Sequence, residues 1–189
     1  MTTPAPRGRG TRGLTRDEVL DAALDLAEER GLSAVGVRAV ASRLGVTPMA
    51  LYRYVGDKDG LLDGLVERLM REMPEDDPDL PWQDRMRAFA AGVRQVARRH
   101  PALFPLLFTR PTVGPEARRP RDAVQDMLRA AGVPEEVVPP LQRLLDTVGM
   151  GLAASEAGGR FTATPEEIDR VHALAEEIFL DAIERYAAR

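Results

Sequence analysis

Two tyrosines and two basic residues lie close together in the first third of the chain. Tyr52, Arg53 and Tyr54 are consecutive, and Lys58, the single lysine of the sequence, follows shortly after them. An arginine can hold the O6 and N7 atoms of guanine with two hydrogen bonds, whereas hydroxyl and ammonium groups bond to phosphate oxygens. Because two near-adjacent tyrosines cannot both face one core, at least one of them is expected to be exposed. The cluster therefore predicts contact with DNA.

Two short helices are predicted to position this cluster. The first, over residues 37–44, has apolar side chains at the spacing of one helix face: Val37, Val40, Ala41 and Leu44. Gly45 then interrupts the pattern, and Thr47 and Pro48 have the residue types of an N-cap and a first helical position. Two short helices joined by a tight glycine turn are typical of a helix-turn-helix, whose second helix can enter the DNA major groove.

The stretch from Leu14 to about Leu65 resembles the tetracycline-repressor (TetR) family of bacterial transcription regulators. The resemblance is carried by A-x-x-L-G-V-x-x-x-x-L-Y-x-Y-V-x-x-K-x-x-L-L, which starts at Ala41. The C-terminal part is similar to the ligand domain of TetR-like members through WQDRMRAFAAGVR and LFTRP. The resemblance implies an all-α fold, with a three-helix helix-turn-helix DNA-binding domain followed by an α-helical ligand-binding and dimerisation domain.

Composition and turn residues divide the chain into three parts. Residues 1–13 are rich in Gly, Pro and Arg, which predicts a disordered basic arm that either follows the DNA or is a solvated tail. Residues 14–72 are expected to form the DNA-binding domain, and residues 81–189 the C-terminal ligand-binding and dimerisation domain. The acidic linker between them, PEDDPDLP, lacks the ligand pattern of a calcium loop.

Hydrophobic periodicity predicts about nine helices and no sheet. The expected helices cover 16–30, 37–44, 48–54, 57–72, 82–99, 102–108, a segment that ends at 131, 135–157 and 165–187, and residues 109–120 are expected to be a loop or a broken helix start. Thr15 with Glu18, and Thr164 with Glu167, have the spacing of capping boxes at the first and last helices.

The charge distribution favours one DNA-facing end. The net charge is −4 over 189 residues, yet residues 1–58 carry nine basic and seven acidic side chains, and the acidic excess lies in the remainder. The sequence contains no cysteine, which excludes disulfides and thiol chemistry. It has neither a long apolar run nor an apolar secretion signal, and a cytoplasmic location is therefore the simplest expectation.

The resemblance and the side-chain chemistry together define the expected DNA contacts. Arg38 suits a phosphate clamp or a base contact, Arg53 a base contact, and Lys58 a phosphate at a helix N-terminus. Tyr52 is similar to the family tyrosine whose hydroxyl meets phosphate. The full expected DNA-binding set is Arg38, Thr47, Pro48, Met49, Ala50, Tyr52, Arg53, Tyr54 and Lys58.

The second half is expected to form a dimer and to enclose a cavity. The resemblance implies a homodimer through the last two long helices, whose small residues permit close approach: Gly149, Gly151, Ala153, Ala154, Ala157, Ala175 and Ala182. The middle helices are expected to surround a site for a small apolar molecule, although each wall residue alone equally suits plain core. The expected ligand-binding residues are Trp82, Met86, Phe89, Val93, Phe104, Leu107, Phe108, Met127, Leu145, Val148 and Leu152.

No cofactor, metal or catalytic residue is expected. In tetracycline-binding members, a histidine just before the L-x-T-R-P stretch helps to bind drug-chelated magnesium, but Leu106 occupies that position here. Asp146 and Glu156 are too far apart along one helix to act as a carboxylate pair, and no nucleophile or phosphate-binding loop is recognisable. These observations argue against an enzyme.

The sequence thus predicts a ligand-responsive homodimeric repressor that a small apolar effector releases from a palindromic operator. Two alternatives stay open: a helical protein-interaction module, which would leave the basic N-terminal end unexplained, and a DNA-binding activator without an effector.

Overall fold

The computed structural model describes residues 13–110 and 115–188, and all regular structure within them is helical. The elements are α1 (Arg16–Arg30), the short 3-10 helix η1 (Leu32–Ala34), α2 (Val37–Leu44), α3 (Pro48–Val55), α4 (Lys58–Glu72), α5 (Trp82–Arg99), α6 (Leu106–Thr109), α7 (Pro115–Ala130), α8 (Val138–Ala157) and α9 (Pro165–Ala187). The expected all-α fold is confirmed. The expected basic arm lies outside the described residues, apart from Gly13. None of the described helices has the length and apolar character needed to cross a membrane.

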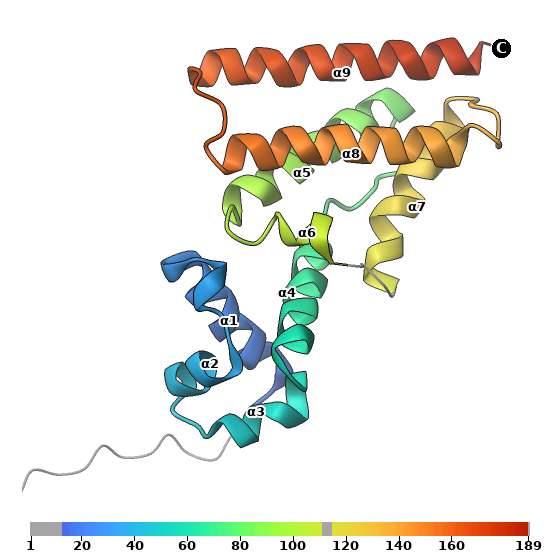
Figure 1. Ribbon diagram of the computed structural model, residues 1–189. Coiled ribbons are helices and arrows are strands. Elements are labelled where there is room, and N and C mark those ends of the chain that lie inside the picture. The colour runs from blue at the N-terminus through green and yellow to red at the C-terminus, as the bar shows by residue number, and fades with distance from the viewer. Residues whose placement is uncertain (1–12, 111–114, 189) are drawn as a thin grey trace, which may run out of the picture.

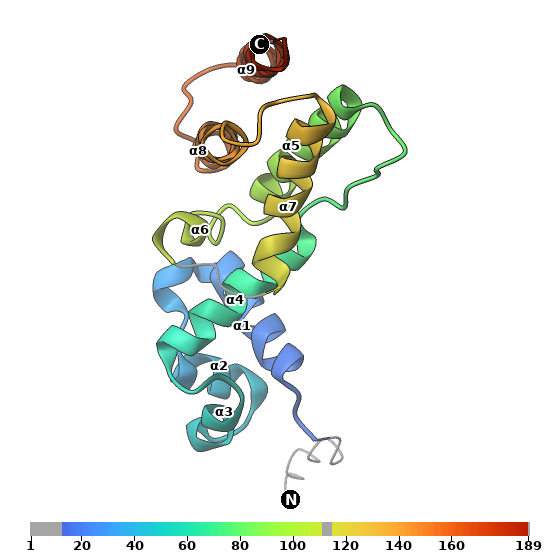
Figure 2. The ribbon, with the colours of Figure 1, turned by 90° about the vertical axis from the view of Figure 1, so that its right-hand side faces the viewer.

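The helices form two halves joined by α4 (Figure 1). Helices α1, α2 and α3 gather at one end, and α4 leads from them towards the other half. There, α8 and α9 run side by side in opposite directions and make the far end of the molecule, with α5 and α7 beneath them. After a quarter turn, both α8 and α9 are seen end-on, so their axes are nearly aligned although the two helices run in opposite directions (Figure 2).

Two capping boxes fix the starts of α1 and α9. The Glu18 amide donates to Thr15 Oγ1 at 3.2 Å, and the Thr15 amide donates to Glu18 Oε2 at 2.9 Å. Thr164 and Glu167 repeat this arrangement at α9, at 3.3 and 2.8 Å. Each box satisfies amide groups that the first turn of a helix leaves without partners. Both predicted capping boxes are confirmed.

The turn between α2 and α3 depends on Gly45. Its backbone adopts the left-handed conformation, with φ 69° and ψ 31°, and its amide donates to carbonyl groups at the end of α2. A side chain would be strained in this conformation, whereas glycine adopts it readily. Thr47 is the N-cap of α3 and Pro48 follows it, as predicted, but the Thr47 side chain makes no capping hydrogen bond.

One apolar core crosses from the helix-turn-helix half into the second half. It contains residues of α1 to α4, such as Leu20, Leu51 and Leu65, together with Val96 of α5 and Phe104 before α6. A second, smaller core joins α7, the loop after it, α8 and Ile183 of α9. Residues of α4, α5 and α6 all belong to the first core. Because this core is closely packed, a displacement of α5 or α6 also displaces α4.

Proline positions explain where the helix bounds differ from those expected. The expected helix over 102–108 is shorter and begins at Leu106, directly after Pro105, because the residue before a proline disfavours helical geometry. In the segment expected to be a loop or a broken helix start, α7 begins at Pro115, where the missing amide proton costs no hydrogen bond, and contains Pro120. Likewise α8 begins at Val138, with a proline in its first turn.

Candidate nucleic-acid interface and ligand cavity

The outer side of α3 is exposed and carries most of the expected reading residues. Met49 is 76% exposed and Tyr52 is 46% exposed, whereas Leu51 lies on the opposite side of the helix and is buried. Thr47 and Arg53 are exposed as well, while Pro48, Ala50 and Tyr54 are half-buried. The Thr47 hydroxyl is not used as a cap, so it is available to a ligand of this surface.

The two tyrosines of α3 have different environments. Tyr52 projects from the surface, whereas Tyr54 packs against the apolar core. The guanidinium carbon of Arg53 lies 4.6 Å from the centre of the Tyr54 ring, a cation–π contact that orients the arginine. The aromatic ring thus supports Arg53, and Tyr52 is the tyrosine whose hydroxyl faces outwards.

Three expected phosphate ligands meet around one surface hollow. Arg38, Tyr52 and Lys58 line a hollow of about 400 Å³ at the N-terminus of α2. Asp57 lies in the same lining, and its carboxylate accepts a hydrogen bond from the Gly60 amide at the start of α4. The N-cap of α2 is Gly36, which has no side chain, so no side chain bonds to the amide groups of the first turn. Unpaired amide groups at a helix start, together with two cations and a hydroxyl, suit an anionic oxygen group such as phosphate.

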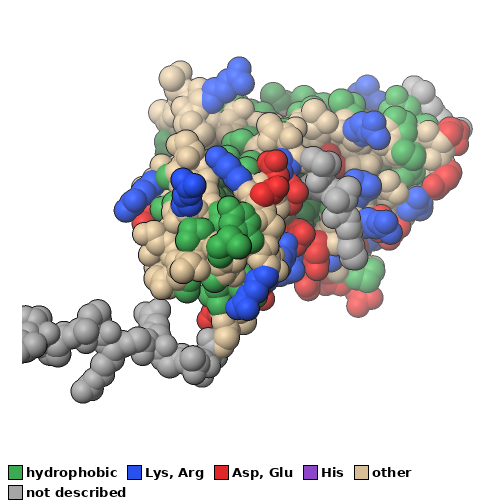
Figure 3. All heavy atoms as spheres, turned by 60° about the horizontal axis from the view of Figure 1, so that its bottom comes forward, with side chains coloured by type: hydrophobic (Ala, Val, Ile, Leu, Met, Phe, Trp, Pro, Cys, Tyr) green, Lys and Arg blue, Asp and Glu red, His purple; other side chains and the backbone are tan. Residues whose placement is uncertain are grey.

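The basic residues of this end differ in whether they are paired. Arg43 is held by Glu29, at 2.8 and 2.7 Å, and by Asp25 at 3.3 Å, so it serves the packing of α2 on α1. In the described part of the chain, Arg38, Arg53 and Lys58 have no ion-pair partner. Figure 3 shows Lys and Arg side chains around a hydrophobic patch at this end of the molecule. The surface therefore combines unneutralised positive charge with exposed apolar side chains.

The second half contains a cavity of about 600 Å³ between α5, α8 and α9, which is partly open to solvent. Five of the expected wall residues line it: Met86, Phe89, Val93, Leu145 and Leu152. The other expected wall residues lie elsewhere. Phe104 and Met127 are buried, Trp82 and Leu107 pack against the two cores, and Phe108 and Val148 are exposed.

Helix α9 contributes to the cavity wall, although none of the expected wall residues belongs to it. The wall includes Phe179 and Leu180 of α9, as well as His172 and Ala175. The sequence of α9 contains a sign of this second role, because the helix is apolar on two sides. Phe179 and Leu180 belong to one side, and Leu174 and Ile178 to the other. Only the packed structure shows that the first side faces α5.

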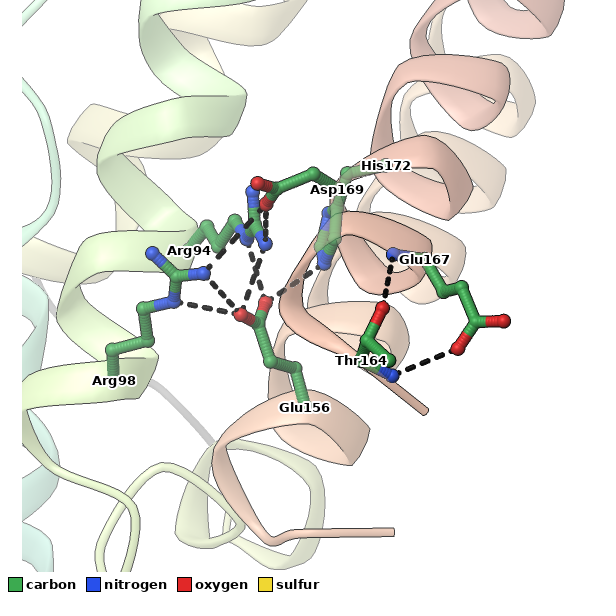
Figure 4. A network of polar contacts seen from close by, with 7 residues as sticks. All are labelled: Arg94, Arg98, Glu156, Thr164, Glu167, Asp169 and His172. Atoms are coloured by element: carbon green, nitrogen blue, oxygen red, sulfur yellow. Dashed lines mark hydrogen bonds and ion pairs between the residues drawn. The ribbon is translucent and has the colours of Figure 1, made fainter. Parts of the chain in front are cut away.

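A network of charged side chains ties the three cavity helices together (Figure 4). Glu156 of α8 accepts hydrogen bonds from Arg94 of α5 at 2.6 and 3.0 Å and from Arg98 at 2.7 Å. Arg94 also donates to Asp169 of α9 at 2.6 Å. Nε2 of His172 lies 2.9 Å from Glu156 Oε2. The network is the main polar connection between α5, α8 and α9.

The charges of the network alter the pKa values of its members. Burial raises the pKa of Glu156, but hydrogen bonds from Arg94 and Arg98 outweigh it and lower the pKa to about 2. Burial lowers the pKa of His172, and the charge of Arg94 lowers it further. At neutral pH, Glu156 is therefore an anion held by two arginines.

The cavity half is joined to the helix-turn-helix half by charged contacts on α4. Arg110, just after α6, pairs with Asp59 and Asp63 near the start of α4. At the other end of α4, Arg119 of α7 donates to the carbonyl oxygens of Met70 and Met73, each at 3.0 Å. These contacts connect both ends of α4 to the second half.

His100 makes a third, buried connection. It ends α5, as the sequence indicated, and its Nδ1 lies 2.7 Å from Glu28 of α1 while its Nε2 lies 3.0 Å from Glu72 of α4. Arg99 also donates to Glu72, at 2.7 Å. Neither this connection nor that of Arg110 is predictable from local sequence patterns, because their partners are distant along the chain.

The fold and its surface define a class, in which a helix-turn-helix head is joined to a helical ligand-binding half. Two family models match the chain: bacterial regulatory proteins of the tetR family over residues 19–65, and a tetracyclin repressor-like C-terminal domain over residues 86–179. The chain belongs to the TetR family, as its sequence motif implied. This is a family of transcriptional regulators and not of enzymes.

Curated relatives include the HTH-type transcriptional repressor DrrR1 of Streptomyces coeruleorubidus, 34% identical over 145 residues, with 76% of this chain and 54% of the relative covered. An HTH-type transcriptional regulator of Saccharopolyspora erythraea is 33% identical over 132 residues, with 68% of this chain and 55% of the relative covered. The chain spans about half the length of these curated relatives.

Solved structures share the fold over nearly the whole chain. Apo ActR from Streptomyces coelicolor has a TM-score of 0.79 at 23% identity, with 93% of this chain and 97% of that one covered. BioQ from Mycobacterium smegmatis has a TM-score of 0.79 at 21% identity, with coverage of 92% and 99%. At such identities the likeness is one of fold alone.

Proposed function

We propose that this protein is a homodimeric transcriptional repressor that binds a palindromic DNA operator and leaves it when a small molecule with an apolar body fills the cavity. The DNA-binding domain covers residues 14–72 and the effector-binding and dimerisation domain residues 81–189. One observation carries the proposal: Arg38, Tyr52 and Lys58 surround the uncapped start of α2, beside an exposed α3. Action on DNA also places the protein in the cytoplasm.

Two kinds of DNA contact follow from this geometry. Arg38, Tyr52 and Lys58 hold a backbone phosphate in the hollow, which fixes the register of the protein on the duplex. Arg53 reads a base edge, and Thr47 and Met49 at the start of α3 contact bases beside it. Pro48 and Ala50 bring the backbone of α3 close to the groove, and Tyr54 holds Arg53 in place.

Repression is favoured over activation by the relatives. DrrR1 is named a transcriptional repressor, and the tetracycline repressor of class D from Escherichia coli is 38% identical over 93 residues, covering 46% of this chain and 41% of the relative. Solved structures of similar fold include BioQ with its double-stranded DNA operator and ActR with actinorhodin. These names support a DNA partner and a small-molecule effector for this chain.

The proposed homodimer pairs α8 and α9 of two copies. In the single chain, both helices expose apolar side chains on the far end of the molecule: Leu144, Val148, Val171, Leu174 and Ile178. Leu174 is 57% exposed and Ile178 is 54% exposed, which is unfavourable in water unless a partner covers them. A second copy is the natural partner, because a two-fold axis would place one operator half-site under each helix-turn-helix.

The contacts on α4 can couple ligand binding in the cavity to DNA binding. An effector that enters between α5, α8 and α9 displaces α5, which shares a core with α4 and holds it through His100. Arg110 and Arg119 connect the two ends of α4 to the same half. A shift of α4 would change the distance between the helix-turn-helix domains of the two copies and so weaken DNA binding. The coupling free energy between effector and DNA in such systems is typically about 1–3 kcal/mol.

A pair of substitutions tests the two kinds of contact. Lys58→Ala is expected to weaken binding to all duplexes alike and to reduce the slope of log affinity against log salt by about 1, because one phosphate contact is lost. Arg53→Ala is expected to lose about 1–3 kcal/mol of discrimination at one base position and to retain most of its non-specific affinity. Fluorescence anisotropy with the preferred duplex and single-base variants of it measures both effects.

The control is Arg160→Ala, which removes the same charge from an exposed position in the loop after α8. It is expected to bind as the wild type does. Equal effects of all three substitutions would mean that only overall charge matters, and the proposed roles of Lys58 and Arg53 would then be wrong.

A further inference from the structure

We infer that the effector is a hydrophobic cation, an amine on an aromatic or polycyclic body, whose ammonium group binds the carboxylate of Asp146. This inference rests on the proposed function, because it takes the cavity between α5, α8 and α9 as the effector site. It begins from the charged side chains in the cavity wall. They are Arg87, Arg94, Arg98, Asp146, Asp169 and Glu176.

The arginines of the wall are all neutralised within the protein. Arg87 donates to Glu176 at 2.9 Å and to Asp84 at 3.0 Å. Arg94 is held between Glu156 and Asp169, and Arg98 also bonds to Glu156. Because each guanidinium has a carboxylate partner, the wall has no unpaired positive charge that would attract an anionic ligand.

Asp146 is the exception among the charged groups of the wall. Within the described residues, no arginine, lysine or histidine nitrogen forms an ion pair with it. Its hydrogen bond comes from the side-chain amide of Gln142, one turn earlier on α8. Gln142 is itself buried, and its side-chain oxygen lies 3.5 Å from the amide nitrogen of Gln125 on α7. The glutamine orients the carboxylate but brings no charge to it.

A carboxylate in this position is costly to the protein. Burial raises the pKa of Asp146, and the opposing effects of Gln142 and of the more distant Arg121 do not cancel the increase. A partly buried carboxylate without a cationic partner destabilises the fold, unless a ligand supplies the missing cation. The structure therefore offers a place for one positive charge.

The rest of the wall defines the body that carries this charge. Met86, Phe89 and Val93 of α5 and Phe179 and Leu180 of α9 provide apolar and aromatic surface. The volume of about 600 Å³ is that of a site for a drug-sized molecule. An apolar ring system would pack against these side chains, and a protonated amine on it would donate a hydrogen bond to the Asp146 carboxylate.

Three fluorescent probes with one ring system test the charge preference. They are 9-(aminomethyl)anthracene, 9-anthracenemethanol and 9-anthracenecarboxylate, which are cationic, neutral and anionic at neutral pH. Binding to the whole chain is measured by anisotropy of the anthracene emission. The amine is expected to bind about tenfold to a hundredfold more tightly than the alcohol, and the carboxylate more weakly than both, as a hydrogen bond between charged groups predicts.

Asp146→Asn assigns the preference to one side chain. It is expected to reduce the affinity for the amine to that for the alcohol and to leave the alcohol unchanged. The matched control is Glu176→Gln, which removes another carboxylate from the wall. In this variant Arg87 loses Glu176 but keeps Asp84 as its partner, so no unpaired arginine is created. The control is expected to retain the preference for the amine. Asp146→Asn is also expected to unfold at the same or a higher temperature than the wild type, which a purely structural Asp146 would not allow.

Measurements on the wild type alone can overturn the inference. Equal affinity for the three probes would do so, and so would tighter binding of the carboxylate probe. Failure of all three probes to bind would overturn it together with the role of the cavity as an effector site. DNA binding by the same preparation then shows whether the DNA-binding part of the proposed function stands without the cavity.

Discussion

Leu174→Arg is expected to make the protein a monomer and to lower its affinity for a palindromic duplex by about a hundredfold to ten-thousandfold, the gain that linked binding of two sites supplies. Leu174 is 57% exposed and belongs to the apolar face that α9 shares with α8. In a two-fold interface the same surface meets itself, so each new arginine is brought into the apolar face of the other copy. Burying such a charge without a partner is strongly unfavourable.

The single chain should tolerate this substitution, because the side chain is already in contact with solvent. Sedimentation velocity gives the oligomeric state and anisotropy gives the affinity for DNA. Glu184→Arg is the control, since Glu184 is exposed and lies about 80° around the axis of α9 from Leu174 and about 120° from Ile178. A Leu174→Arg protein that stayed dimeric and bound DNA normally would mean that two copies pair through another surface.

Glu156→Gln is expected to lower the free energy of unfolding by about 3 kcal/mol at pH 7. The pKa of Glu156 falls from its usual 4.5 to about 2 in the fold, and a shift of that size corresponds to about 3 kcal/mol of stabilisation. Its side chain is only 9% exposed, so solvent screens the interaction little. Glutamine keeps the shape but removes the buried carboxylate that binds both Arg94 and Arg98, which leaves them only the exposed Asp169 as an acidic partner.

The pH dependence has a definite sign. A carboxylate whose pKa is lowered by folding contributes its full stabilisation above its unfolded value of 4.5 and loses it as the pH falls to about 2. Urea unfolding at one protein concentration should therefore separate wild type and Glu156→Gln widely at pH 7 and bring them together near pH 2. Asp169→Asn, which changes a 62% exposed partner of Arg94, should cost less than about 1 kcal/mol. A gap between wild type and Glu156→Gln that was small at pH 7 would contradict the role given to Glu156.

The helix-turn-helix could be predicted in detail because its signals are local. Gly45 needs a left-handed backbone, Thr15 and Glu18 meet within one turn, and the spacing of Val37, Val40 and Ala41 fixes the buried side of α2. None of these features depends on residues far away in the sequence. The bounds of α2 and α5 are the same in the sequence analysis and in the structure.

The cavity could be predicted only in part because it depends on how distant helices meet. Leu145 and Val148 belong to the same apolar stripe of the sequence, yet Leu145 lines the cavity and Val148 is exposed. Glu156 meets arginines of α5, 62 and 58 residues away, and no periodicity reveals such a pair. The spacing of Asp146 and Glu156 along α8 shows only that they cannot form a pair, whereas in the structure Asp146 lies in the cavity wall without a cationic partner among the described residues.

The central claim is that two copies of this chain read one DNA site. Selection of duplexes from a random DNA pool with the wild-type protein, followed by anisotropy at two salt concentrations, tests it most directly. We expect the most enriched duplex to be palindromic and to bind two chains, with an affinity that falls steeply as the salt concentration rises. The absence of any enriched duplex, or binding that does not respond to salt, would contradict it.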